Sequence, residues 1–513
     1  MSPEREPRLL FVTSNGTGLG HLTRSLAIAR RLPGGVEPLF VTFSAAAPVV
    51  RELGFPVEYV ASYDRPGAGN DLTWTWRTRE RLRALTAEAR PSVVMFDGTH
   101  PYERLLPALR ASGAALVWCR RAMWRPGADT APLHRSHLFD AILEPGEAAA
   151  EADAGPTAAR RQEAVRVGPI VLLDRSELLP RAEAERELGL APGRLNVLVQ
   201  LGQGEGVAAA AERCLRHLAA VEGVQVAAPA STLAGLAEPP PGVVRLGARY
   251  PIGRYLAAFD AAIAAAGYNA FHELLELGPP ALFVPMERQT DDQAARARFA
   301  AARGLALAAA GPDDPGLERL LGELLDAGRR QAIASALGAA RGASGAAEAA
   351  RWLAGLAHGH PAPRPGSQRR GSPEAAGAPA APAPRPPAAS LAVRLRRWWI
   401  FVASVPSTIL RIVRQTLTRP RTRAVVLDFG HADGAAAERA LAALGERPER
   451  VLVVTDRLDF RALLAAGVGF EHIPAEGERQ AQLAGVPYDE FRRRRLDLIL
   501  ARRPRRRRIV PAA

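Results

Sequence analysis

Short apolar runs alternate along the chain with amphipathic stretches and with turns rich in glycine or proline. A short continuous apolar run predicts a strand that is covered on both faces of a parallel sheet, and helical spacing predicts the connecting helix. In the first third of the chain the predicted strands lie at 9–12, 38–43, 57–60, 92–96, 114–118 and 141–143. This strand–helix rhythm over 8–170 predicts a doubly wound α/β domain, which we assign to residues 1–164.

A second α/β rhythm begins near Val165. Its predicted strands lie at 196–200, 224–226, 243–246 and 281–284, and helices fill 294–357. We therefore predict a second Rossmann-like domain over 165–358, so that the fold class is α/β with two doubly wound domains.

The composition changes after this second domain. Residues 359–390 are an Ala/Pro/Gly/Arg/Ser linker, which buries too little apolar surface to fold and is predicted to be disordered. Residues 391–423 carry eight arginines, two adjacent tryptophans and no acid, which is typical of a basic segment at an anionic membrane surface. From 424 to 513 a small α/β domain of unknown role is expected, with a basic tail at 492–508 that is predicted to be solvated.

The stretch from Ala265 to Gln293 carries the clearest chemistry. It contains a glycine turn at Gly267, an amphipathic helix, a buried strand, and a polar loop over 287–293. A glycine turn at a helix N-terminus offers free backbone N–H groups to a phosphate, and Glu273 lies further along the helix, where it can accept hydrogen bonds from ribose hydroxyls. Polar loops at the carboxyl ends of strands are where open α/β sheets bind ligands. Phosphate, ribose and sugar groups in this order indicate a nucleotide-sugar site.

Two further glycine loops follow predicted strands. The first is G-x-G-x-G-H at 16–21, where His21 stands at the start of a helix, and the second is LGQGEG at 201–206. We take His21 as the candidate base, because an imidazole titrates near neutral pH, and Asp97 at the end of its strand as its orienting partner. The alternative is that both residues cap helices, and His100 is a rival for either role. Arg24 and Arg249 are candidates for neutralising a diphosphate.

The positive charge of the chain comes from arginine alone. The formal net charge is +14 and all 67 basic residues are arginine, since the chain contains no lysine. Pyridoxal-phosphate chemistry and a Walker A loop are therefore excluded, because both require lysine. The arginine runs permit phosphate contacts with nucleic acid, but tryptophans beside arginine at 391–423 favour anionic lipid. Two cysteines, the absence of a secretory h-region, and no apolar run of roughly 18–20 residues predict a cytosolic protein or one on the cytosolic face of a membrane.

The stretch 265–293 resembles the donor-binding signature of family 28 glycosyltransferases, and the likeness covers roughly 8–357. It implies a GT-B fold and an inverting transfer from a UDP-sugar that needs neither metal nor cofactor. By this resemblance, Gly267 and the amides after it face the diphosphate, Glu273 faces the ribose, and Asp292 and Gln293 face the sugar. The chain departs from the family at Ala266-Gly267, where Ser-Gly is common, and at Tyr268-Asn269, where smaller residues and Thr are commoner.

The resemblance also places the other loops. The loop with Gly18 and Gly20 is implied to face the donor phosphates and the acceptor, and 247–254, with Arg249, to contact the uracil. The second glycine loop is implied to open the first helix of the donor domain; its residues are Gly202, Gln203 and Gly204.

The sequence therefore predicts a glycosyltransferase that moves a hexose or N-acetylhexosamine from a UDP-sugar to a lipid-linked or cell-envelope glycan acceptor. Its predicted place is the inner face of the plasma membrane, and nucleic acid is not an expected partner. Two alternatives stay open: a UDP-sugar 2-epimerase with the same fold, and a non-catalytic membrane-associated polysaccharide-assembly protein.

Overall fold

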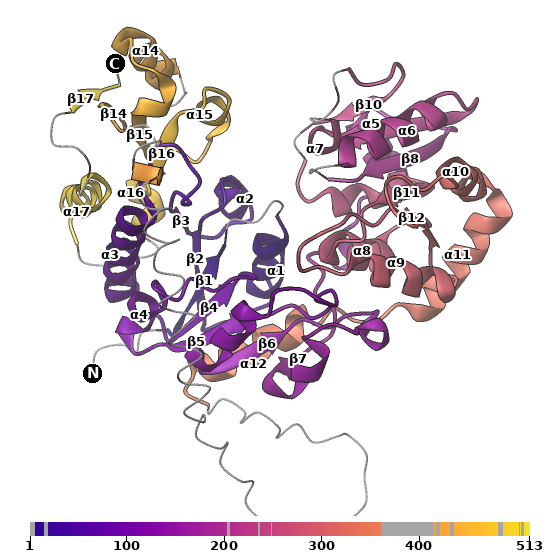
Figure 1. The fold of residues 1–513 in the computed structure, drawn as a ribbon, viewed down its shortest axis with the longest axis horizontal. Helices are drawn as coiled ribbons and strands as arrows, with labels where there is room; N and C mark the ends of the chain where they lie inside the picture. The colour runs from indigo at the N-terminus through magenta and orange to yellow at the C-terminus, as the bar shows by residue number, and fades with distance from the viewer. Residues whose placement is uncertain are drawn as a thin grey trace, which may run out of the picture. The chain divides into compact units, whose positions relative to one another are not determined.

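The protein is described by a computed structural model, which covers residues 6–14, 19–202, 206–233, 236, 238–247, 249–360, 414–416, 421–430, 435–480, 486–501, 503 and 507–512. It divides into two compact units (Figure 1). The first unit comprises 1–57 and 89–365, and the second comprises 58–88 and 366–513. Both predicted Rossmann-like halves belong to the first unit, except for residues 58–88, which belong to the second.

A parallel sheet organises the N-terminal half of the first unit. Its strands run in the order β2-β1-β4-β5-β6-β7. They are β1 (Arg8–Thr13), β2 (Glu37–Thr42), β4 (Val93–Asp97), β5 (Ala115–Cys119), β6 (Ala141–Glu144) and β7 (Val165–Arg166), with helices α1 (Gly20–Ala29), α2 (Ala47–Glu52) and α4 (Leu106–Leu109). β3 (Val57–Tyr59) begins at the last residue of the segment 1–57. The strand order reverses between β1 and β4, and such a switch point is where this kind of sheet binds ligands.

A second parallel sheet follows, in the order β10-β9-β8-β11-β12-β13. Its strands are β8 (Leu195–Gln200), β9 (Val224–Pro229), β10 (Val244–Leu246), β11 (Ala261–Ala264), β12 (Ala281–Phe283) and β13 (Leu307–Ala308). Its helices are α5 (Arg181–Leu188), α6 (Val207–Ala219), α7 (Ala230–Leu233), the 3-10 helix η6 (Ile252–Ala258), α8 (Tyr268–Leu277), α9 (Gln293–Ala302), α10 (Leu317–Leu325) and α11 (Ala327–Ala340). This order reverses between β8 and β11, so the loop that contains Gly267 also lies at a switch point.

The chain crosses between the two halves twice, and neither crossing falls at the predicted boundaries. β7 pairs with β6, so the strand at Val165 completes the first sheet and does not open the second. After α11 the chain returns, and α12 (Ala346–Ala357) packs against α1, β1 and β4 of the N-terminal half (Figure 1). Local periodicity does not reveal such a return, because a helix has the same pattern whichever sheet it covers.

The second unit contains a parallel sheet in the order β16-β15-β14-β17. Its strands are β14 (Ala424–Asp428), β15 (Val451–Thr455), β16 (Gly469–His472) and β17 (Arg508–Pro511), and its helices are α14 (Ala435–Leu444), α15 (Arg461–Ala465), α16 (Glu476–Gln480) and α17 (Tyr488–Leu500). The small α/β domain that was predicted from residue 424 is present.

The helix α3 (Asp71–Ala89) is rich in arginine, a composition typical of a solvated helix. Two of its arginines, Arg77 and Arg81, are nevertheless buried. Arg81 pairs with Glu58 at 2.7 Å and with Glu471 of β16 at 2.9 Å. The residues of α3 that belong to the second unit therefore pack within it, although they come from the N-terminal part of the sequence. In the basic tail that was predicted to be solvated, Arg493 and Arg494 are exposed, whereas Arg495 of α17 is 1% exposed.

Most of the predicted linker and of the segment 391–423 lies outside the described residues, so those two predictions stay predictions. Among the residues that are described, none of the helices combines the length and the apolar character that a membrane span requires.

Candidate active site

His21 and Asp97 meet at the switch point of the first sheet. Thr13 at the end of β1 is in register with Asp97 at the end of β4, so the segments that leave these strands start from the same edge of the sheet. His21 is the second residue of α1, and its Nδ1 lies 2.6 Å from Asp97 Oδ1. The structure thus brings together the two residues that the sequence paired, and it leaves their chemical roles as a prediction.

Arg24 is a third member of this cluster. It lies one turn after His21 on α1 and is 1% exposed. Its Nη2 donates to Asp97 Oδ1 at 2.6 Å, and its Nε donates to Asp97 Oδ2 at 3.2 Å. The sequence offered Arg24 to a diphosphate, whereas here it binds a carboxylate with both arms. The spacing of three residues on one helix face was the available signal.

These contacts fix the charge state of the pair. Burial alone would raise the pKa of Asp97, but Arg24 and His21 hold that pKa below its ordinary value. An ionised carboxylate only accepts hydrogen bonds, so the short contact requires that His21 Nδ1–H donates to Asp97. The unprotonated nitrogen of His21 is then Nε2, which is the atom able to accept a proton.

The environment also keeps His21 neutral. Burial lowers the pKa of His21; Asp97 opposes this shift, and the positive charges of Arg24 and Arg121 add to it. The side chain remains 14% exposed, so it is accessible to a substrate. The rival His100 is exposed, and within the described structure it forms no hydrogen bond with His21 or Asp97. The geometry therefore favours His21 over His100.

The glycine turn of the second half faces this cluster. Gly267 is the N-cap of α8, and no side chain caps that helix end. The next two residues reach the first half: Asn269 Nδ2 donates to the carbonyl of Gly20 at 3.4 Å, and the ring of Tyr268 lies 5.3 Å from the Arg24 guanidinium. The N-termini of α1 and α8 are therefore close together, with His21 beside them.

Glu273 lies on α8 without a compensating partner. Its carboxylate forms no hydrogen bond or ion pair with any residue in the described part of the chain, and burial raises its pKa to about 7. A Cβ added at Gly253 would come within 2.3 Å of Glu273 Oε1, so the backbone of η6 closely approaches this carboxylate. Glu273 thus faces the segment 247–254 that the resemblance assigned to the uracil, and its oxygens are available to hydroxyl donors.

Arg249 does not contact His21, Gly267 or Glu273 in the described structure. Its Nη2 donates to the carbonyl of Glu187 at 2.6 Å, and its guanidinium lies 5.5 Å from the ring centre of Tyr255. These contacts hold Arg249 against α5. Gly202 follows β8 with φ +78°, a left-handed conformation that glycine adopts without strain. Gly18, Gln203 and Gly204 lie outside the described residues.

The side chains of the polar loop before α9 form hydrogen bonds within the loop and to the start of the helix. Asp292 caps α9 by accepting a hydrogen bond from Ala295 N at 2.9 Å. Gln293 is 5% exposed, and its Oε1 accepts from Met286 N at 3.0 Å while its Nε2 faces Asp291 Oδ2 at 3.4 Å. These contacts show both side chains holding the loop in shape. Their assignment to the donor sugar remains a prediction.

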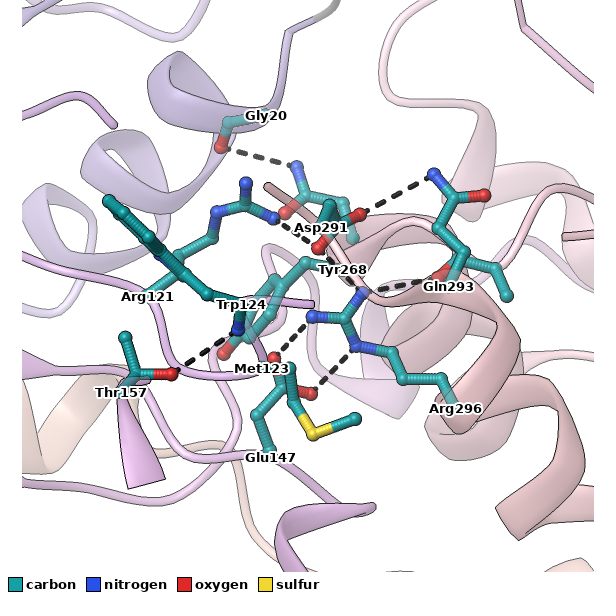
Figure 2. Close-up of polar contacts among 12 residues, drawn as sticks. Gly20, Arg121, Met123, Trp124, Glu147, Thr157, Tyr268, Asp291, Gln293 and Arg296 are labelled. Atoms are coloured by element: carbon teal, nitrogen blue, oxygen red, sulfur yellow. Dashed lines mark hydrogen bonds and ion pairs between the residues drawn. The ribbon is translucent and has the colours of Figure 1, made fainter. Parts of the chain in front are cut away.

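Asp291 is the loop residue that faces the other half (Figure 2). Its Oδ1 accepts from Arg121 Nη1 at 3.0 Å and from Arg296 Nη1 at 2.8 Å. Although burial would raise the pKa of Asp291, these two arginines lower it to about 2. The neighbouring backbone forms an antiparallel bridge between Trp124 and Asp291. The adjacent acids Asp291 and Asp292 therefore differ in role: the first binds arginine and the second caps a helix.

A buried ion pair that the sequence did not suggest also joins the halves. Arg296 of α9 binds Glu147 through both arms, at 2.6 and 2.9 Å, and both side chains are almost fully buried (Figure 2). Glu147 also lies 3.4 Å from His272 Nε2. That nitrogen accepts a hydrogen bond from Ala148 N at 3.1 Å, and burial lowers the pKa of His272, so this histidine is neutral.

The chain was compared with known proteins. No protein-family model matches it. It is 31% identical over 311 residues to the UDP-N-acetylglucosamine–N-acetylmuramyl-(pentapeptide) pyrophosphoryl-undecaprenol N-acetylglucosamine transferase of Nocardioides sp., a match that covers 56% of this chain and 81% of that protein. It is 46% identical over 69 residues to the transferase of the same name from Synechococcus sp., covering 13% and 19%.

Among solved structures, the Spinosyn Forosaminyltransferase SpnP superposes with a TM-score of 0.50 at 17% identity, covering 68% of this chain and 99% of that one. At this identity the likeness shows the fold alone, and that fold is GT-B. The predicted fold class is confirmed.

Proposed function

The chain belongs to the family of UDP-N-acetylglucosamine–N-acetylmuramyl-(pentapeptide) pyrophosphoryl-undecaprenol N-acetylglucosamine transferases, and from this membership we propose the reaction that it catalyses. It is a glycosyltransferase that uses a UDP-sugar and a lipid-linked acceptor. We propose that it transfers a hexose or N-acetylhexosamine with inversion, and that it needs neither a metal nor a cofactor.

One observation carries the proposal: the helix N-termini of α1 and α8 face each other at two switch points, with His21 between them. In the proposed reaction, His21 Nε2 accepts the proton of the acceptor hydroxyl as its oxygen attacks the anomeric carbon. The bond from that carbon to the diphosphate breaks on the opposite face, which inverts the configuration. The amides at the start of α8 stabilise the negative charge on the departing UDP.

The remaining residues position these groups. Asp97 and Arg24 hold the imidazole ring, and Glu273 accepts hydrogen bonds from the ribose hydroxyls of the donor. Since the acceptor is lipid-linked, we further propose that the basic segment 391–423 binds the anionic inner face of the plasma membrane.

The test measures UDP release from a panel of UDP-sugars, with and without a lipid-linked acceptor. We expect release to require the acceptor. We expect His21→Ala to lower turnover at least tenfold while UDP affinity stays the same, and Glu273→Ala to weaken UDP binding. The two variants thus distinguish the role of His21 in catalysis from the role of Glu273 in donor binding.

Other outcomes favour other functions. Conversion of the UDP-sugar without any acceptor would favour the 2-epimerase, which needs acid and base groups but no second substrate. Binding of UDP with no turnover in any combination would favour a non-catalytic assembly protein. Unchanged turnover in His21→Ala would exclude His21 as the base.

A further inference from the structure

A cavity lies in the first unit, and none of the candidate site residues lines it. Its volume is about 450 Å³. Its polar wall consists of Arg31 just after α1, Asp174 and Arg175 after β7, Glu276 of α8, and Arg341 and Ser344 between α11 and α12. The walls therefore come from both halves of the unit and from both segments that cross between them.

Two arginines in this cavity form no ion pair among the described residues. Within the described structure, neither Arg175 nor Arg341 lies within ion-pair distance of a carboxylate. Arg175 donates to the backbone carbonyl of Glu276. Arg341 Nη2 donates to the carbonyl of Gly278 at 3.3 Å, and its buried Nε has no acceptor. A buried donor without an acceptor costs free energy, which a ligand that supplies an acceptor recovers.

The other charges of the cavity neutralise these two arginines only in part, through the Glu276 carboxylate. Arg31 is paired with Asp174 at 2.8 Å. The Glu276 carboxylate accepts a hydrogen bond from Gly342 N at 3.2 Å, and burial raises its pKa. Three guanidinium groups thus face two carboxylates, which leaves an excess of positive charge. Burial and the neighbouring Arg175 lower the pKa of Arg341, and the Glu276 carboxylate opposes this shift without reversing it.

We propose that this cavity binds a phosphate group between Arg175 and Arg341, at a site separate from the donor diphosphate. Guanidinium groups match phosphate oxygens with paired, charge-assisted hydrogen bonds. Phosphate oxygens also give the buried Arg341 Nε an acceptor. The site goes beyond the glycosyl transfer proposed above and does not depend on it.

The experiment titrates inorganic phosphate into the full chain by calorimetry, with the ionic strength kept constant by chloride. We expect saturable binding at one site. Arg341→Gln and Arg175→Gln should each weaken it at least about tenfold, because each removes a charge-assisted contact. Arg175 is exposed, so its variant tests the site even if Arg341→Gln does not fold.

The matched control is Arg216→Gln, which removes an exposed arginine of α6 that is paired with Glu212. It should leave phosphate binding unchanged, and saturating UDP should also leave it unchanged. Glycerol 3-phosphate in a parallel titration distinguishes the source: tighter binding than inorganic phosphate indicates a headgroup, and equal binding indicates free phosphate. The proposal is overturned if wild type shows no saturable phosphate binding, if the control loses as much affinity, or if UDP displaces the phosphate.

Discussion

Three charged groups act on the imidazole of His21, and each comes from a different place in the fold. Asp97 ends β4, Arg24 lies one turn along α1, and Arg121 follows β5. The carboxylate favours the protonated ring, whereas burial and the two arginines favour the neutral ring, and the neutral ring prevails. A general base must be unprotonated to act, so the arginines keep His21 active at a lower pH than free histidine would allow.

Arg24→Gln tests this balance. Removing a positive charge that lies 2.9 Å from His21 Nδ1 should raise the pKa of His21. The acid limb of the kcat/KM profile should then move to higher pH, by about one pH unit, because the protonated ring is inactive below its pKa. Arg24→Lys keeps the charge and should leave the limb nearer to that of wild type. A limb that stays in place in Arg24→Gln would show that another group controls the profile.

At the scale of elements, the strand and turn assignments could be made from sequence because they rest on local patterns. Apolar runs marked β1, β4, β8 and β12, and the glycine turn at Gly267 marked the start of α8. The pair His21–Asp97 was predictable too, because both residues follow strands of one parallel sheet, whose carboxyl ends share an edge.

Contacts between elements could not be predicted from local sequence patterns. Glu147 and Arg296 stand far apart in the sequence, in a chain whose 67 basic residues are all arginine, so nothing local distinguished the buried one. The same applies to Asp291 and Asp292: adjacent acids look equivalent until the helix start shows which one caps it.

The Glu147–Arg296 pair joins the segment after β6 to α9, and its strength is open to measurement. Glu147→Gln leaves a buried guanidinium partly uncompensated, so we expect the free energy of unfolding to fall by about 3 kcal/mol in urea denaturation. The pair Glu151–Arg303 joins the same region to the other end of α9 but is exposed. Glu151→Gln should therefore cost less than about 1 kcal/mol. Equal losses would show that burial does not set the strength of this contact.

At the scale of the whole molecule, the two compact units do not correspond to two continuous stretches of the sequence. Residues 58–88 leave the N-terminal half and belong to the unit that contains the C-terminal sheet. Tyr59 stacks on Phe470 at 5.3 Å, and Arg495 of α17 pairs with Glu88 at 2.6 Å. Arginine-rich helices usually are solvated, and only the acids of a distant segment make burial of these arginines favourable.

Arg495→Leu tests whether the second unit is held together in this way. Arg495 is 1% exposed and also lies 3.2 Å from Glu58. Its removal takes the partner from Glu88 and leaves the buried Glu58 with Arg81 alone, so the expected loss of stability is about 3–5 kcal/mol. Hydrogen exchange followed by mass spectrometry should show faster exchange in α3 and β14–β16, whereas β4, β11 and the affinity for UDP stay unchanged. Arg494→Gln, on the same helix but exposed and paired with Glu490, is the control. Equal acceleration in β4 and β11 would mean that the two units unfold together, because local loss of a buried ion pair exposes only the residues that open with it.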